Sequence, residues 1–412
     1  MGLIKRIKNS KKPLLGQIID LIPSSIIIKA VSDYNSDHYC KTYRTYNQLV
    51  ALLFGQLNKC YTLRDIVVGF NVSADFLRDV GLKRTPARST MSYGHQHRDW
   101  RVFESIFKNT LSHYERLFTR TAYYKPLIQL KGRIVNIVDS TTISLCLNLF
   151  SWASFRTRKG AIKIHTQLDE RSELPIVVHV SKGKMADRQG IDYLSIQDGS
   201  VLIDDRAYYD YRAFMDYIKR DITFVTRTKS TTKFRLCYRE RMSKEDRKAM
   251  VIKVQVVTIA GNLAKQIALN EQKLRVITIW DDKNQKQLRV LTNNLDWPAH
   301  VVAELYKRRW KIELFFKALK QNLQVKTFIG TSENAVKSQI YVALLSYILL
   351  EFIRRHLSEA GHAFKQFVNL IRICLMKYQG LTYVANNIDY SAHSLPTNPE
   401  RDVGQFSLFN TT

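Results

Sequence analysis

The segment Arg133-Ile-Val-Asn-Ile-Val-Asp139 is rich in β-branched residues and ends in an acid. Such a run predicts a buried strand. Two more short apolar runs, each bounded by turn residues, follow at 162–169 and 174–181. The three runs together predict an antiparallel meander.

A second group of elements continues this layer. Residues 200–205 repeat the buried-strand pattern, a helical stretch runs to Arg220, and residues 222–227 give a fifth strand. Three strands followed by a strand, a helix and a strand predict an α/β fold with a mixed sheet. Residues 228–296 then contain four strand-like runs and little helix, which predicts a β-rich insertion.

The flanking regions are helical in pattern. Residues 13–125 carry apolar side chains at helical spacing, so we predict a helical N-terminal domain over 1–125 and a catalytic domain over 126–385. Residues 386–412 form a polar C-terminal tail. Within the N-terminal domain, Ser89–Arg98 predicts a short polar helix. It is either the recognition helix of a helix-turn-helix or an ordinary surface helix.

The chain is strongly basic. Lys and Arg number 64 against 36 Asp and Glu, a net charge of +28. Cations that neutralise phosphates bind through counterion release, so nucleic acid is the favoured partner and a ribosomal or membrane-surface role is the competing interpretation. The basic residues are spread along the whole chain, which favours extended contact with a long ligand.

Other features narrow the setting. The N-terminus lacks the apolar core of a secretory signal. The apolar run Ile340–Leu350 is too short to span a bilayer, so we expect a buried helix and no membrane association. The five cysteines are odd in number and widely scattered, which favours neither a disulfide framework nor a zinc site. A reducing cytoplasm is the expected location.

Three acids form a candidate site. Asp139 and Asp205 end the first and fourth predicted strands, where ligands of open α/β sheets collect, and Glu313 lies on a helix after the insertion. Two carboxylates at one rim repel each other unless a cation lies between them, and hard oxygen ligands suit Mg²⁺ or Mn²⁺. An Asp that ends a strand is more often a turn or cap residue, and the residues alone do not choose between Asp204 and Asp205.

The helix that carries Glu313 is unusual in composition. In Tyr306-Lys-Arg-Arg-Trp-Lys-Ile-Glu-Leu-Phe-Phe-Lys-Ala-Leu-Lys320, a regular helix of about 100° per residue places Tyr306, Arg309, Glu313 and Lys320 on one face. A carboxylate beside a phenol, a guanidinium and an ammonium can hold a metal ion while these neighbours hold phosphates. The alternative is a solvated face of ion pairs, which the interleaved apolar residues disfavour.

The spacing Tyr-x2-Arg-x3-Glu-x6-Lys resembles the signature of the bacterial insertion-sequence transposases of the IS-four family, which are DDE-type enzymes on an RNase H-like fold. Ile137–Ile143 resembles the first acidic motif of that family. Asp205-Arg-Ala-Tyr208 resembles the second, with Ala207 where the family has Gly. The resemblance covers most of residues 13–385.

The resemblance implies specific roles. Asp139, Asp205 and Glu313 would be the catalytic residues and would hold Mg²⁺, with Mn²⁺ as a substitute; this choice favours Asp205 over Asp204. Tyr306, Arg309 and Lys320 would bind backbone phosphates of the transposon end.

The same resemblance implies a DNA transposase that cuts at transposon ends and joins them to target DNA. Its partners would be double-stranded DNA, as terminal inverted repeats and target, and a second copy of the chain in a homodimer. It would act in the bacterial cytoplasm at the nucleoid. The alternatives are an RNase H-like nuclease or resolvase without strand transfer, and an inactive DNA-binding derivative.

Two smaller questions stay open. Lys163 and His165 lie in a basic stretch similar to one in the family, and are interpreted either as DNA contacts or as exposed strand residues. Trp310 and Trp280 are candidates to hold an unstacked base during the reaction, or are buried core residues.

Overall fold

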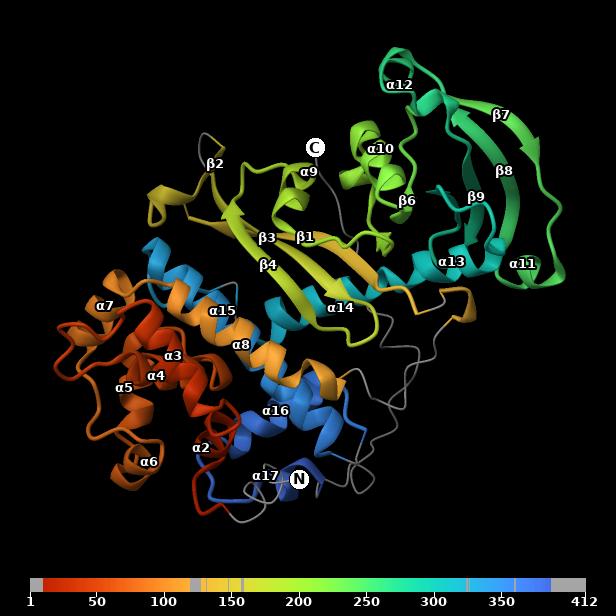
Figure 1. Ribbon diagram of the computed structural model, residues 1–412. Coiled ribbons are helices and arrows are strands. Elements are labelled where there is room, and N and C mark those ends of the chain that lie inside the picture. The colour runs from red at the N-terminus through yellow and green to blue at the C-terminus, as the bar shows by residue number, and fades with distance from the viewer. Residues whose placement is uncertain are drawn as a thin grey trace.

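The computed structural model describes residues 10–118, 127–130, 132–146, 148–156, 159–323, 325, 327–358 and 361–386. Within them, ten strands form a single mixed sheet. Helices cover both faces of this sheet, and two hydrophobic clusters lie between the sheet and its two helical layers (Figure 1).

Five strands make the central part of the sheet. Their spatial order is β4 (Pro175–Lys182), β3 (Lys159–Asp169), β1 (Val135–Leu145), β5 (Val201–Ile203) and β6 (Thr223–Arg227). The first three are antiparallel, whereas β5 and β6 run parallel to β1. The helix α10 (Tyr211–Lys219) connects β5 to β6. In chain order these strands lie 3-2-1-4-5, which confirms the predicted mixed, RNase H-like sheet.

The first strand is longer than predicted. It runs to Leu145 because β3 pairs along nearly its whole length, while β5 pairs only with Val135–Ile137. The sequence predicted that Asp139 ends this strand. In the structure Asp139 lies inside the strand. Asp139 lies just beyond the last β1 residue that pairs with β5. The strand end expected beside this acid is therefore the end of β5, which is short.

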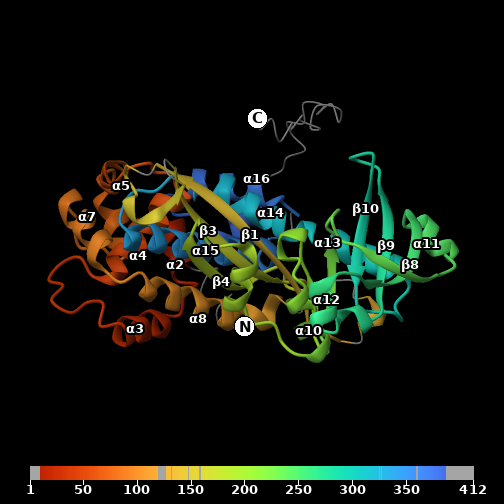
Figure 2. The ribbon, with the colours of Figure 1, turned by 90° about the horizontal axis from the view of Figure 1, so that it is seen from above.

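The insertion extends the same sheet. Its strands β7 (Phe234–Arg239), β8 (Val251–Ile259), β9 (Leu274–Asp281) and β10 (Lys286–Thr292) are antiparallel, and β10 pairs with β6. Each of the four strand-like runs in the sequence corresponds to one of them. Seen from above, the insertion forms one end of an elongated molecule and the N-terminal helices form the other (Figure 2).

The N-terminal helices share a core with the C-terminal ones. Tyr114 of α8 (Arg101–Phe118) packs on Phe352 of α15 (Glu333–His356), with ring centroids 4.4 Å apart. The other helices of this body are α2 (Leu14–Ile19), α3 (Ser24–Asp33), α4 (Thr45–Leu57), α5 (Leu63–Phe70), α6 (Ala74–Asp79), α7 (Arg88–His97), α16 (Phe364–Cys374) and α17 (Leu381–Asn386). The predicted domain boundary at residue 125 and all but the first residue of the predicted tail lie outside the described residues.

The long helix α15 was underestimated from sequence. Its 24 residues make it long and apolar enough to cross a membrane by length and composition. However, 94% of its most apolar window is buried inside the protein, against α4, α8 and α16. The prediction of a buried helix is confirmed, but the argument from insufficient length was wrong.

The signature segment is not one regular helix. It consists of α13 (Ala299–Arg308), α14 (Trp310–Lys317) and a π-helical turn at Ala318–Asn322. Arg309 joins α13 to α14 through hydrogen bonds that span three residues in place of four. Its N–H donates to Tyr306 O, and its carbonyl accepts from Ile312 N. Lys320 lies on the π turn, so its angular position departs from that of a regular helix.

The predicted polar helix at 89–98 is present as α7. Ser89, Ser92 and Tyr93 point outward, whereas His95 and Arg98 are buried. Arg98 donates to Tyr43 O at 2.7 Å, so it braces the N-terminal helices.

We expect His95 to make stability depend on acid pH. Burial, with a smaller contribution from Arg98, lowers the pKa of His95 to about 4. Below pH 6.5 the unfolded chain binds a proton that the folded chain does not, so stability is lost as pH falls from about 6.5 to 4. In urea denaturation, the difference in unfolding free energy between pH 7.5 and 4.5 should shrink in His95→Gln. An identical difference in both proteins would contradict this role.

Candidate active site

The three acids come from three elements that meet at one face of the sheet. Asp139 lies on β1, Asp205 follows β5, and Glu313 lies on α14. Because side chains alternate along a strand, Asp139 and Asp205 share the face of Ile137 and Ile203, whose cluster includes residues of α13 and α14.

Two signature side chains join the acids. The Nη1 atom of Arg309 lies 3.4 Å from Asp139 Oδ2, and its Nη2 atom donates to Glu313 Oε1. The Tyr306 hydroxyl lies 3.5 Å from Asp205 Oδ1. The guanidinium carbon of Arg309 is 5.9 Å from the centre of the Tyr306 ring. The structure thus brings five of the six predicted site residues together. The sixth, Lys320, is half-buried on the π turn beyond α14.

Arg309 stands between carboxylates that a metal would share. In the part of the chain that the structure describes, no three His, Cys, Asp or Glu side chains are close enough to hold one ion. Burial raises the pKa of Asp139 to about 7, the Ser140 N–H and Arg309 lower it, and Asp205 and Glu313 raise it. This mutual repulsion and the all-carboxylate donor set suit a divalent cation.

The structure also separates Asp204 from Asp205. Asp204 is 1% exposed and lies on the opposite face, beside Thr226 and near Tyr217 of α10. Burial raises the pKa of Asp204 to about 8. A carboxyl in that interior position favours its neutral form, so Asp205 is the better placed of the two to bind a cation.

Lys163 and His165 are not exposed strand residues, and His165 is not a DNA contact. His165 is fully buried, with its Nε2 atom 3.1 Å from Ser181 Oγ, and burial lowers its pKa to about 4. Lys163 lies 3.1 Å from Asp187 and donates to Met185 O. Asp187 also accepts a hydrogen bond from the hydroxyl of Ser140, the residue after Asp139. No motif in the sequence marked Asp187 as a neighbour of the first acid.

Neither of the two candidate tryptophans is a fully buried core residue. Trp310 is 58% exposed and so is not a core residue. Trp280 is half-buried in the insertion, with its indole N–H 3.0 Å from Asp282 Oδ1.

An ion-pair network around a buried acid positions the signature segment where α13 meets α14. Glu170, in the turn between β3 and β4, is fully buried and lies 3.0 Å from Arg308 and 2.7 Å from Lys311. Its backbone N–H donates to Val135 O on β1. The residues on either side of Arg309 are thus attached to the sheet. Glu170 was missed from sequence because an isolated acid in a turn carries no signal of its partners.

Two family models match parts of the chain. Residues 130–349, more than half of the chain, match the family model described as Transposase DDE domain. Residues 10–83 match a domain of unknown function, DUF4372.

Relatives and solved structures show further likenesses. A probable transposase for an insertion sequence element from Geobacillus stearothermophilus is 27% identical over 58% of this chain, which spans 61% of that relative. A transposase homologue from Sinorhizobium fredii is 28% identical over 62% of this chain and 70% of its own length. The piggyBac transposase synaptic complex with hairpin DNA has a TM-score of 0.38 at 12% identity, covering 96% of this chain and 85% of that one.

The family match includes the central strands, the three acids and the signature helix. This family implies the use of a divalent metal. The chain belongs to the transposase DDE domain family.

Proposed function

We propose that this chain is an insertion-sequence DNA transposase of the IS-four type, which cuts at transposon ends and joins the exposed 3′-hydroxyls to target DNA. The observation that carries the proposal is that Asp139, Asp205 and Glu313 are each bonded to Tyr306 or Arg309 on one face of an RNase H-like sheet. The net charge of +28 independently favours a phosphate polymer as substrate.

Asp139, Asp205 and Glu313 would hold Mg²⁺, or Mn²⁺ in its place. A divalent cation bound there supplies an activated water or hydroxyl and stabilises the leaving oxygen of a phosphodiester. Arg309 neutralises two of these acids in this structure, and its guanidinium becomes available to a DNA phosphate when they have another counterion. Tyr306 and Lys320 would bind the same backbone. Each step is a substitution at phosphorus, so a single site can serve cleavage and joining.

The partners follow from this chemistry. Terminal inverted repeats and target DNA are the proposed duplex substrates, and a homodimer would bridge the two ends. The helical N-terminal domain would bind the ends. The insertion, which shares the sheet with β6, would hold DNA or brace α13. A protein of this kind acts on DNA in the bacterial cytoplasm.

Strand transfer tests the proposal. Purified protein is incubated with labelled terminal-repeat DNA, supercoiled plasmid and Mg²⁺, and the expected result is label joined to the plasmid. Nicked ends without joined product would instead favour a nuclease or resolvase. Binding without cleavage would favour an inactive DNA-binding derivative.

Replacing Arg309 is expected to make stability more dependent on metal. Arg309→Gln removes the counterion of Asp139 and Glu313, so the metal-free protein should lose about 1–3 kcal/mol of unfolding free energy at pH 8. Addition of Mg²⁺, without DNA, should then stabilise the variant more than the wild type. Thermal melts with and without Mg²⁺ measure both effects. The control is Arg309→Lys, which keeps the charge. Equal Mg²⁺ responses in all three proteins would show that Arg309 and the cation do not compete.

A further inference from the structure

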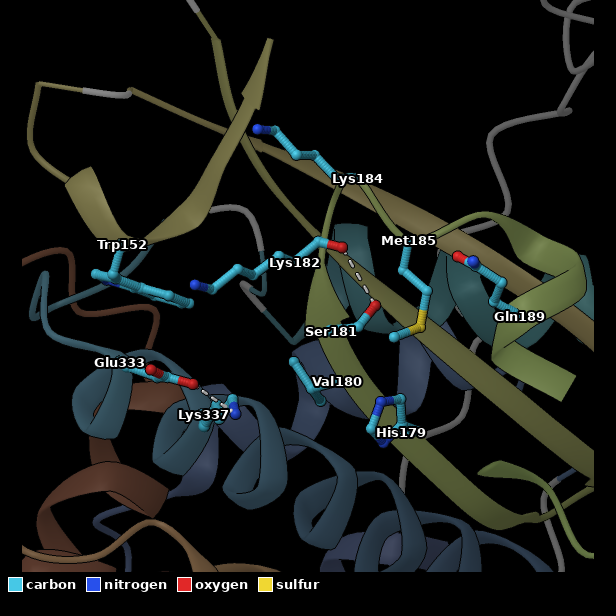
Figure 3. A pocket seen from close by; sticks show the side chains of 10 residues that line it. All are labelled: Trp152, His179, Val180, Ser181, Lys182, Lys184, Met185, Gln189, Glu333 and Lys337. Atoms are coloured by element: carbon cyan, nitrogen blue, oxygen red, sulfur yellow. Dashed lines mark hydrogen bonds and ion pairs between the residues drawn. The ribbon is translucent and has the colours of Figure 1, made fainter. Parts of the chain in front are cut away.

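A cavity opens at the outer edge of β4, which β3 separates from β1 (Figure 3). We call it the β4-edge pocket. Its volume is about 440 Å³, and it lies between β4, the loop after β4, Trp152 and the first turns of α15. Within the described residues β4 pairs only with β3, so this side of the sheet carries no further strand. The volume falls within the range of small-ligand sites.

The pocket is cationic. Among the described residues that line it, the acid is Glu333, and its carboxylate lies 2.7 Å from the ammonium of Lys337. Lys182 and Lys184 are exposed and have no lining acid beside them. In Figure 3 Lys184 extends outward from the loop, and Lys182 and Trp152 both line the opening. Two exposed ammonium groups that pair with no acid among the described lining residues favour a phosphate-bearing ligand.

The pocket also offers a fixed aromatic surface. Trp152 is half-buried, and its indole N–H donates to Thr331 O at 2.8 Å, which restrains the plane of the ring. Base stacking on an aromatic ring tolerates any base, and lysines beside the ring bind the backbone. An aromatic face with two free ammoniums matches one nucleotide of a DNA strand better than an isolated phosphate.

A short series of contacts connects the pocket to β1, the strand that carries the first acid. Met185, on the pocket wall, accepts a hydrogen bond from Lys163 through its carbonyl at 2.9 Å. Lys163 pairs with Asp187, and Asp187 accepts from Ser140, the neighbour of Asp139. Because side chains alternate along β1, Ser140 lies on the face of the sheet opposite the carboxylate of Asp139, so these contacts fix the pocket wall to the strand that carries the acid.

We propose that the β4-edge pocket binds one nucleotide of the DNA on which the three acids act, with its phosphate at Lys182 and Lys184 and its base against Trp152. The inference rests on the proposed function, because it assumes a DNA strand at the three acids. The strand has two possible sources, the flank of the transposon end and the target, and the pocket chemistry is the same for both.

The test measures DNA affinity of the full chain against salt, with a fluorescein-labelled single-stranded thymidine 20-mer as probe. Two single-strand phosphate contacts contribute about 2 × 0.7 = 1.4 to the slope of log affinity against log salt, so Lys182→Gln/Lys184→Gln should lower the slope by about 1.4. Trp152→Ala should weaken binding roughly five- to 150-fold, and Trp152→Phe should restore most of it. Melting temperatures report whether the Ala variant folds.

The matched control is Lys365→Gln/Lys377→Gln, two exposed lysines on and after α16, beyond the opposite end of α15. This pair should leave the slope unchanged. An unchanged slope in Lys182→Gln/Lys184→Gln, or equal slopes in the two double variants, would overturn the pocket. Failure of the wild type to bind any DNA would overturn both the pocket and the proposed function.

Two further arms identify the strand. One compares terminal-repeat duplexes that end at the cleavage position with duplexes that carry a ten-nucleotide flank, and the other measures capture of target plasmid. If the pocket variants bind only the flanked duplex more weakly than the wild type does, the pocket is assigned to donor DNA. If they capture less target plasmid than the wild type does, it is assigned to the target. The variants should still cut the unflanked duplex, so loss of the pocket remains distinguishable from loss of the chemistry.

Discussion

Exchange of Glu313 for Gln is expected to lower the rate of DNA cleavage by about a thousandfold or more, because an anionic metal ligand typically contributes several kcal/mol to such a reaction. The amide keeps the size of the side chain and removes its charge. Glu313 now bonds to Arg309, which also contacts Asp139, so the loss should reach both ligands. Cleavage of labelled terminal-repeat DNA with Mg²⁺ measures the rate, and anisotropy should show that DNA is still bound.

The same experiment has a control on the preceding helix. Glu304 is exposed and pairs only loosely with Arg308 at 3.4 Å, so Glu304→Gln should retain nearly full activity. Unchanged cleavage in Glu313→Gln would remove this residue from the mechanism.

The neighbouring aspartates provide a sharper comparison. Asp204→Asn substitutes a neutral group for a buried carboxyl that already favours its neutral form, and most activity should remain. Asp205→Asn should lose cleavage as Glu313→Gln does. The opposite order would mean that the face of the sheet that binds metal has been assigned wrongly.

Removal of Glu170 should destabilise the protein by up to about 3–5 kcal/mol, since it takes the fully buried carboxylate out of an ion-pair network. Glu170→Ala removes the buried carboxylate that Arg308 and Lys311 share and leaves them their more exposed partners Glu304 and Glu173. Because the two cations flank Arg309, metal-dependent cleavage should fall as well. Urea denaturation measures the loss of unfolding free energy.

Glu173 gives the matched comparison for Glu170. It also pairs with Lys311, at 3.0 Å, but its side chain is 41% exposed. Glu173→Ala should therefore cost at most about 1 kcal/mol, as is typical of a pair open to water. If the two variants lose equal stability, burial of Glu170 is not what makes its network strong.

The strands were predictable where local pattern and burial agree. Each of the nine runs read as strand at 133–227 and 234–293 overlaps a strand of the structure. The end of β1 was not predictable, because its length depends on which partner remains beside it after Ile137. The break at Arg309 and the π turn at Lys320 were missed for a similar reason: helical periodicity assumes a regular helix.

The site was predictable only in its residues, and not in their bonds. The motifs marked Asp139, Asp205 and Glu313 as candidates, and the structure places them on one face, while strand alternation explains why Asp204 points away. The contacts of Arg309 with two acids, and those of Asp187 and Glu170, join segments far apart in the chain. Tertiary packing determines which residues these side chains contact, so no local sequence pattern predicts the contacts.

The pairing of β10 with β6 limits how this protein can be re-engineered. Excision of residues 228–296 would leave the outer backbone groups of β6 without partners, and an open sheet edge invites self-association. A trimmed variant would then precipitate for reasons unrelated to catalysis. Exchange of the whole insertion with a homologue is the safer route, provided that the donor segment ends in a strand able to align three residues with Val225–Arg227.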